Sequence, residues 1–70
     1  MNAKLRGYVQ KIENLQELSE DDILKLGVEL DEYLETLPQD EIDEFAYSGY
    51  GEMLYMVASG IRYQRENKIQ

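Results

Sequence analysis

Residues 53–61 read MLYMVASGI and form the longest nearly uncharged, apolar run in this 70-residue chain. At about 100° per residue, the apolar side chains of the run reach almost all the way round a helix; they are Met53, Leu54, Met56, Val57, Ala58 and Ile61. A helix that is apolar on every side lies inside a core or between subunits. We therefore expect a central helix here, with the other helices of the chain packed on it.

The preceding residues, Ser48-Gly49-Tyr50-Gly51, decide where the last helix starts. Two glycines so close together weaken a helix, and glycines beside serine often mark turns. We favour a break or kink near Gly49, with Ser48 capping a final helix that runs to about Glu66. The alternative is one continuous helix, because apolar and small residues stay in phase across the glycines: Ile42, Phe45, Ala46, Gly49, Met53, Met56 and Gly60.

Leu37-Pro38 separates two further predicted helices. The residue before a proline is pushed out of the α region, and proline is favoured in the first turn of a helix. We therefore expect one helix to end at Thr36 and another to run from Pro38 to about Tyr47. This second helix is expected to bury Ile42, Phe45 and Ala46.

Ser19-Glu20-Asp21-Asp22 has the Ser-x-x-acid form of a capping box and starts the helix that we place at about residues 20–36. Leu18 and Ile23 flank it at the spacing of a hydrophobic staple. Leu24 and Val28 lie one turn apart on one side of this helix, either as a core contact or as an exposed binding ridge. The main core face carries Ile23, Leu26, Leu30, Tyr33, Leu34 and Leu37.

The first helix is expected at about residues 3–17, because apolar residues recur there with the spacing of one helix face. These residues are Leu5, Tyr8, Val9, Ile12 and Leu15. Together the helices predict an all-α fold, a compact antiparallel bundle of three or four short helices with short connecting loops. We expect a single small helical domain that spans residues 1–70.

The net charge of −8 is unevenly distributed along the chain. Residues 13–52 hold 14 of the 15 acidic residues and one basic residue, Lys25, whereas Arg62, Arg65 and Lys68 make the C-terminal end basic. A negative field argues against direct nucleic-acid binding, which depends on neutralising phosphates, and it suits a basic partner. The apolar run falls short of the roughly 20 residues that cross a bilayer, so we expect a cytoplasmic protein that contacts no membrane.

The residue types present exclude several kinds of chemistry. The chain has no Cys and no His, so it lacks disulfides, thiolate metal ligands and the residue most used in general acid–base catalysis. The acidic cluster at residues 40–44 lacks the glycine and the final glutamate of a calcium loop. Gly49-x-Gly51 lacks the third glycine of a dinucleotide motif. We predict a non-enzymatic protein with no cofactor and no metal site.

Residues 24–34, LKLGVELDEYL, resemble the second helix of the small aspartyl-phosphate phosphatases of the sporulation phosphorelay. That family consists of two-helix hairpins with a Ser-Gln-x-Leu-Asp motif. Leu30 and Asp31 match the motif, whereas Gly27 and Val28 stand where the family has Ser and Gln. We carry no catalytic role across.

Tyrosines dominate the aromatic residues of the chain, six of seven. Tyrosine is enriched at interfaces because it joins a large apolar body to a polar tip. The alternative is that these rings cover the edge of a small core with their hydroxyls outward. Tyr55 and Arg62 project from nearly the same side of the last helix, which is our first choice for a partner surface. The predicted partner-binding residues are Leu24, Val28, Tyr47, Tyr50, Tyr55 and Arg62.

The preferred function is that of a small acidic regulator or adaptor that acts by protein–protein contact. The alternative is an acidic mimic of nucleic-acid charge that inhibits a basic nucleic-acid-binding protein. We also expect a homodimer through the C-terminal helix, because short neighbouring helices cannot cover every side of it. Leaving Leu54, Val57 and Ile61 in water would forgo roughly 1.5–3 kcal/mol each.

Overall fold

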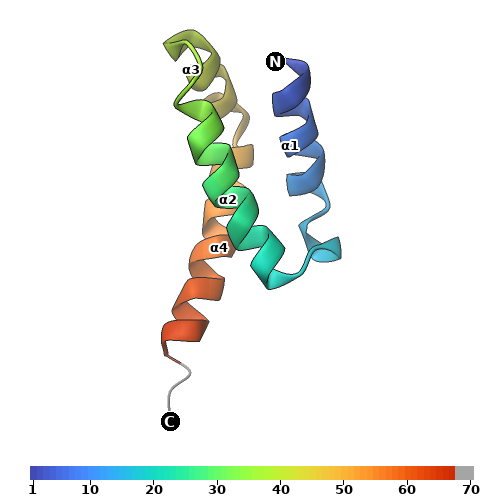
Figure 1. The fold of residues 1–70 in the computed structure, drawn as a ribbon, viewed down its shortest axis with the longest axis vertical. Helices are drawn as coiled ribbons and strands as arrows, with labels where there is room; N and C mark the ends of the chain where they lie inside the picture. Colours follow the sequence, from blue (N-terminus) through green and yellow to red (C-terminus); the bar gives the residue numbers. More distant parts are fainter. Residues whose placement is uncertain (68–70) are drawn as a thin grey trace.

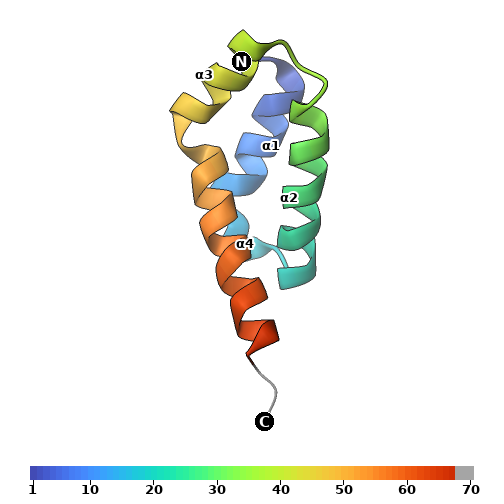
Figure 2. The ribbon, with the colours of Figure 1, turned by 90° about the vertical axis from the view of Figure 1, so that its left-hand side faces the viewer.

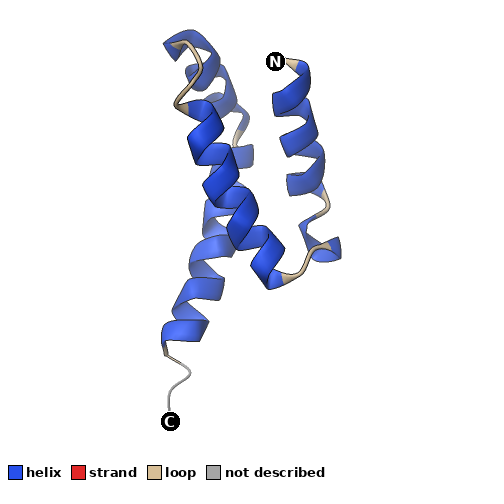
Figure 3. Ribbon diagram, in the orientation of Figure 1, coloured by secondary structure: helices blue, strands red, loops and turns tan. Residues whose placement is uncertain are grey.

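Four α-helices and one short 3₁₀ helix make up most of the computed structural model, which describes residues 1–67 (Figures 1 and 3). No strand occurs within these residues, which confirms the predicted all-α fold. Lys68, part of the predicted basic end, lies outside the described residues. In chain order the elements are α1 (Ala3–Glu13), η1 (Leu15–Glu17), α2 (Glu20–Leu34), α3 (Gln39–Ser48) and α4 (Tyr50–Glu66).

The helices form a bundle in which α2 runs antiparallel to both α1 and α4 (Figures 1 and 2). Each of α1, α2 and α3 packs on α4, so α4 is the shared packing partner that the sequence predicts. Side-chain contacts match this arrangement. Arg65 near the end of α4 forms an ion pair with Asp21 at the start of α2, at 2.8 Å. The ammonium group of Lys4 in α1 lies 4.6 Å from the ring centre of Tyr33 in α2.

The start of α2 confirms the predicted helix cap. The Ser19 hydroxyl accepts a hydrogen bond from the backbone N–H of Asp22 at 3.1 Å, and Ser19 itself has extended backbone angles. Both features are those of an N-cap residue, which satisfies an amide that the helix leaves without a partner. Leu18 is half-buried and Ile23 is buried, in agreement with a hydrophobic staple across the cap.

The first helix is shorter than predicted, because α1 ends at Glu13 and a separate 3₁₀ turn follows it. Asn14 leaves the helical region, and its side-chain amide donates to the carbonyl of Gln10 at 2.8 Å. Asparagine interrupts helices in this way because its short side chain reaches nearby backbone groups. Leu15 is still buried, so its predicted place in the core is confirmed although the predicted helix is interrupted.

The core is one cluster of apolar side chains that all four α-helices and η1 contribute. Three of its members come from α4, spaced so that they share one face of that helix. No buried polar or charged residue lies among residues 1–67. The buried members are Leu5, Ile12, Leu15, Ile23, Leu26, Leu30, Phe45, Leu54, Ala58 and Ile61.

The prediction that residues 53–61 are buried on every side is wrong. Met53, Met56 and Val57 leave 47%, 70% and 38% of their surface exposed. The three other α-helices all meet α4 on the side that carries its buried residues. Within residues 1–67 there is no further helix to cover the opposite side, so that side faces solvent.

The chain breaks between α3 and α4 at Gly49, which confirms the predicted break and rules out one continuous helix. Gly49 has a φ of +82°, in the left-handed region that favours glycine, and its N–H donates to the carbonyl of Ala46 at 3.3 Å. Gly49 rather than Ser48 flanks α4, although the Ser48 hydroxyl accepts from the N–H of Tyr50 at 3.3 Å. The break changes the direction of the chain between α3 and α4 (Figure 2).

Candidate functional site

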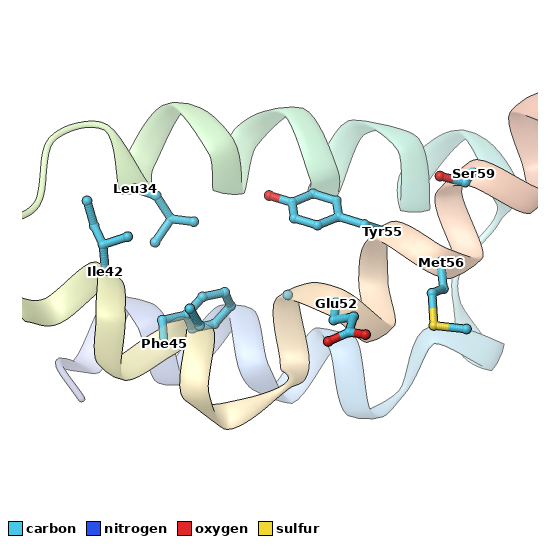
Figure 4. Close-up of a pocket in the computed structure, with 9 residues that line it drawn as sticks. Leu34, Ile42, Phe45, Glu52, Tyr55, Met56 and Ser59 are labelled. Atoms are coloured by element: carbon cyan, nitrogen blue, oxygen red, sulfur yellow. The ribbon is translucent and has the colours of Figure 1, made fainter. Parts of the chain in front are cut away.

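An open groove lies between the C-terminal end of α2, α3 and the first half of α4 (Figure 4). Its volume is about 650 Å³. In Figure 4, Leu34 and Ile42 point toward each other across one end of the groove. Most of its wall is apolar and consists of Leu34 from α2, Ile42, Phe45 and Ala46 from α3, and Met56 from α4. We call this surface the α2–α3–α4 groove.

The floor of the groove depends on a glycine beneath an aromatic ring. Phe45 is only 2% exposed, and a Cβ atom built on Gly51 would lie 2.9 Å from its Cε2 atom. That distance is shorter than packed carbon atoms tolerate, so only glycine leaves room for the ring at this point. The positive φ of Gly49 and the close approach at Gly51 therefore act together to place α3 against α4.

Polar groups border the groove along α4. The Tyr55 hydroxyl donates a hydrogen bond to the carboxylate of Asp31, and so links α4 to α2. Glu52 lines the groove and is exposed, and it takes part in none of the ion pairs found in residues 1–67. The groove therefore combines apolar walls with a carboxylate and a phenol at its edge.

Two of the tyrosines predicted to bind a partner bridge helices within the chain. The Tyr50 hydroxyl donates to a carboxylate oxygen of Glu13 at the end of α1, at 3.0 Å. This hydrogen bond, together with the negative charge of Glu13, raises the pKa of Tyr50 above its ordinary value. Tyr55 points instead to Asp31 on α2. Because the two rings face different helices, they do not form one continuous surface.

The other predicted partner-binding residues are spread over three helices. Leu24 on α2 is half-buried against the core, whereas Val28, one turn later, is 50% exposed. Tyr47 on α3 is 95% exposed, and Arg62 on α4 is exposed as well. Of the six predicted residues, only Tyr55 lines the α2–α3–α4 groove.

The sequence pattern did not single out the groove itself. Its apolar residues from α2 and α3 were expected in the core, but Leu34 and Ile42 are half-buried and Ala46 is exposed. The signal that could have found them is the break at Gly49. Because the chain bends at Gly49, the apolar faces of α3 and α4 no longer form one straight stripe. A single straight helix such as α2 cannot cover both faces, so part of the apolar surface stays uncovered.

The described part of the chain shows few features of a chemical centre. No group of three or more Asp, Glu, His or Cys side chains in residues 1–67 could hold a metal ion. No buried side-chain nitrogen or oxygen in that range lacks a hydrogen-bond partner. Among the same residues, no helix is long and apolar enough to span a bilayer. The predictions of a non-enzymatic, cytoplasmic protein without cofactors stay predictions.

Comparisons with known proteins do not assign this site. No protein family, no curated protein and no solved structure matches the chain. The resemblance of residues 24–34 to the phosphorelay phosphatases is thus not accompanied by a family match. The site has to be interpreted from its own geometry.

Proposed function

We propose that this protein is a small acidic, non-enzymatic regulator or adaptor that binds another protein through the α2–α3–α4 groove. The observation that carries the proposal is the groove itself, a mostly apolar groove with a volume of about 650 Å³ that no part of residues 1–67 covers. Ligand pockets are typically concave and mostly apolar, with a small number of polar groups that fix orientation, and the grooves that bind a helix of a partner protein are hydrophobic as well. The carboxylate of Glu52 and the phenol of Tyr55 supply such groups here.

The energetics of the groove favour contact with a partner. Met56 is 70% exposed in the free protein, and covering it would contribute about 1–2 kcal/mol by the usual value for a buried side chain. Leu34, Ile42 and Ala46 add partly exposed apolar surface next to it. A few such anchors in one concave surface commonly carry most of the binding energy of a protein interface.

A specific observation also supports the alternative function, the acidic mimic of nucleic-acid charge. All the acidic residues except Glu41 are exposed, so the negative charge of residues 13–52 is on the surface. A mimic would bind its basic partner through these charges and not through the groove. Its binding would fall steeply as salt rises, because the Debye length shrinks from about 10 Å at 0.1 M to about 3 Å at 1 M.

Site-specific photocrosslinking tests the groove directly. A photoreactive amino acid would replace Met56, which lines the groove, or Met53, which lies on the same helix outside it. We expect an extract of the native host to give a defined adduct with a host protein at position 56, and at position 53 at most an adduct with a second copy of this chain. Apolar contact should preserve part of the adduct at position 56 at about 1 M salt. Equal adducts at both positions would contradict the groove as the binding site. Adducts with a host protein that form at both positions and disappear in high salt would support the charge mimic.

The predicted homodimer stays a separate proposal, with a changed physical reason. Leu54 and Ile61 are buried within the chain, so they no longer require a second copy. The exposed apolar residues Met53 and Val57, which lie one turn apart on α4 outside the groove, now provide the surface that a second copy could cover. Met53 is 47% exposed and Val57 is 38% exposed, and we propose that this outer side of α4 forms the dimer contact.

A further inference from the structure

We propose that the occupant of the α2–α3–α4 groove is a basic amphipathic helix of another protein. Its apolar side chains would enter the groove, and its lysines or arginines would lie against the carboxylates around it. This inference rests on the proposed function above and names the kind of partner. Three properties of the groove support it, namely its charge, its wall and the absence of an available strand edge.

The charge of the segments that build the groove is mainly negative. Between Lys25 and Arg62 the chain has nine acidic residues and no basic residue, and all three helices that build the groove draw on this stretch. Glu52 lies in the wall itself, and Asp31 lies beside it through its bond to Tyr55. A basic segment would be drawn to this surface, whereas an acidic segment would be repelled from it.

The chain offsets this charge only in part. The N-terminal ammonium of Met1 forms an ion pair with Glu44 on α3 at 3.4 Å, and Arg62 lies on the same side of α4 as Tyr55. Two other basic residues make contacts elsewhere. Arg65 forms ion pairs with Asp21 and Glu20 at the opposite end of α2, at 2.8 and 3.5 Å. Lys4 lies over the ring of Tyr33, between α1 and α2. The negative field of the groove is therefore available to a partner.

The wall of the groove favours a helix over an extended segment. An extended peptide usually binds by adding a strand to the exposed edge of a sheet, and residues 1–67 contain no strand. The groove offers side chains on three helices, and an amphipathic helix fits such a surface with apolar residues on successive turns. The volume of about 650 Å³ suits a small number of large side chains.

Three synthetic peptides separate the contributions of charge and apolar contact. The first is an amphipathic helix of about four turns, with leucines on one face and lysines on the other. The second carries glutamates in place of the lysines, and the third carries glutamines in place of the leucines. We expect the first peptide to bind, and the other two to bind at least about tenfold more weakly, because several charges and several apolar anchors are lost.

Matched variants of the protein locate the binding site. We expect Met56→Gln to weaken binding of the first peptide by about tenfold, as the loss of an apolar anchor does, and Met53→Gln to leave it unchanged. Glu52→Lys should weaken it by about two- to fivefold, within the range for exposed ion pairs, and should reduce its salt dependence. Glu66→Lys makes the same change in net charge away from the groove and serves as the control. Thermal melts of each variant check that it is folded.

The outcomes distinguish this inference from the proposed function. Equal binding of the lysine and glutamate peptides would overturn the basic partner and leave the groove as a binding site. Equal binding of the peptide without leucines would overturn the apolar contact and point to the charge mimic. If no peptide binds but a host protein still crosslinks at position 56, the helical basic occupant is wrong and the proposed function stands.

Discussion

Replacing Gly51 by alanine tests the packing that forms the floor of the groove. The added Cβ would lie 2.9 Å from Cε2 of Phe45, whose side chain is almost fully buried. Overpacking of this kind typically costs about 1–3 kcal/mol. Alanine in place of glycine stabilises the interior of a helix by up to about 1 kcal/mol. The gain in stability is smaller in the first turn of a helix, where Gly51 lies. We therefore expect Gly51→Ala to lower the free energy of unfolding by about 1–2 kcal/mol.

Gly60 provides a matched control in the same helix. It lies in the interior of α4, and a Cβ atom there would meet no other atom within 4 Å. Gly60→Ala should therefore stabilise the protein by about 0.5–1 kcal/mol, through helix propensity alone. Gly7→Ala in α1 meets the same open space and should also stabilise, independently of any contact that α4 makes with a second copy.

Urea denaturation would measure both effects. With a slope near 1 kcal/mol per molar urea, as for a small domain, the midpoints of Gly51→Ala and Gly60→Ala should move by about 1 M in opposite directions. Combining Gly51→Ala with Phe45→Leu should cost less than the sum of the two single changes, because the smaller side chain relieves the contact. If Gly51→Ala stabilises the protein as much as Gly60→Ala does, the close packing of Phe45 on Gly51 is refuted.

Four further results are expected. Ser19→Ala should lower the free energy of unfolding by about 1 kcal/mol, because it removes the hydroxyl that accepts from the backbone N–H of Asp22. An unchanged urea midpoint would show that this cap does not contribute to stability. Thermal melts with Ca²⁺, Mg²⁺ or Zn²⁺ should overlay those with chelator, because the acidic cluster at residues 40–44 lacks the pattern of a calcium loop. A saturable rise in Tm would disprove the prediction that the chain has no metal site. Since the pKa of Tyr50 is raised in the folded protein, its contribution to stability should be complete below the ordinary tyrosine pKa and lost as the pH rises through the folded value. Ultraviolet titrations of the natural protein and of Glu13→Gln should show one tyrosine that ionises at lower pH in the variant, and identical titrations would contradict the effect of Glu13. Sedimentation equilibrium at micromolar concentration should show a dimer that Met53→Glu or Val57→Glu dissociates without unfolding. A strict monomer of 8.2 kDa would exclude it.

Local signals in the sequence predicted the helices well. Ser19, Pro38 and Gly49 each act through a backbone preference or a nearby hydrogen bond, and the structure has a helix boundary at each of them. Asn14 also ends a helix by a local hydrogen bond, but the apolar pattern continued to Leu15 and hid this interruption. Boundaries were therefore predictable where the residue and its partner are close in sequence.

The packing of the last helix was less predictable, because it depends on residues far away in the chain. The apolar run at residues 53–61 indicates how much of the surface of α4 could be buried. It does not indicate how many other helices are available to cover that surface. The three neighbours meet one side, so Leu54 is buried while Met56 is exposed. The groove follows from the same geometry together with the bend at Gly49, and no short sequence motif encodes it.

The three methionines of the chain allow the most direct test of the groove as a binding site. With ¹³C-labelled methyl groups, Met1, Met53 and Met56 give separate NMR signals, and Met56 alone among them lines the groove. During titration with the basic amphipathic peptide, we predict a saturable shift of the Met56 methyl signal while those of Met1 and Met53 stay in place. Peptide binding that moves the Met53 signal and leaves the Met56 signal unchanged would contradict the groove and place the contact on the outer side of α4.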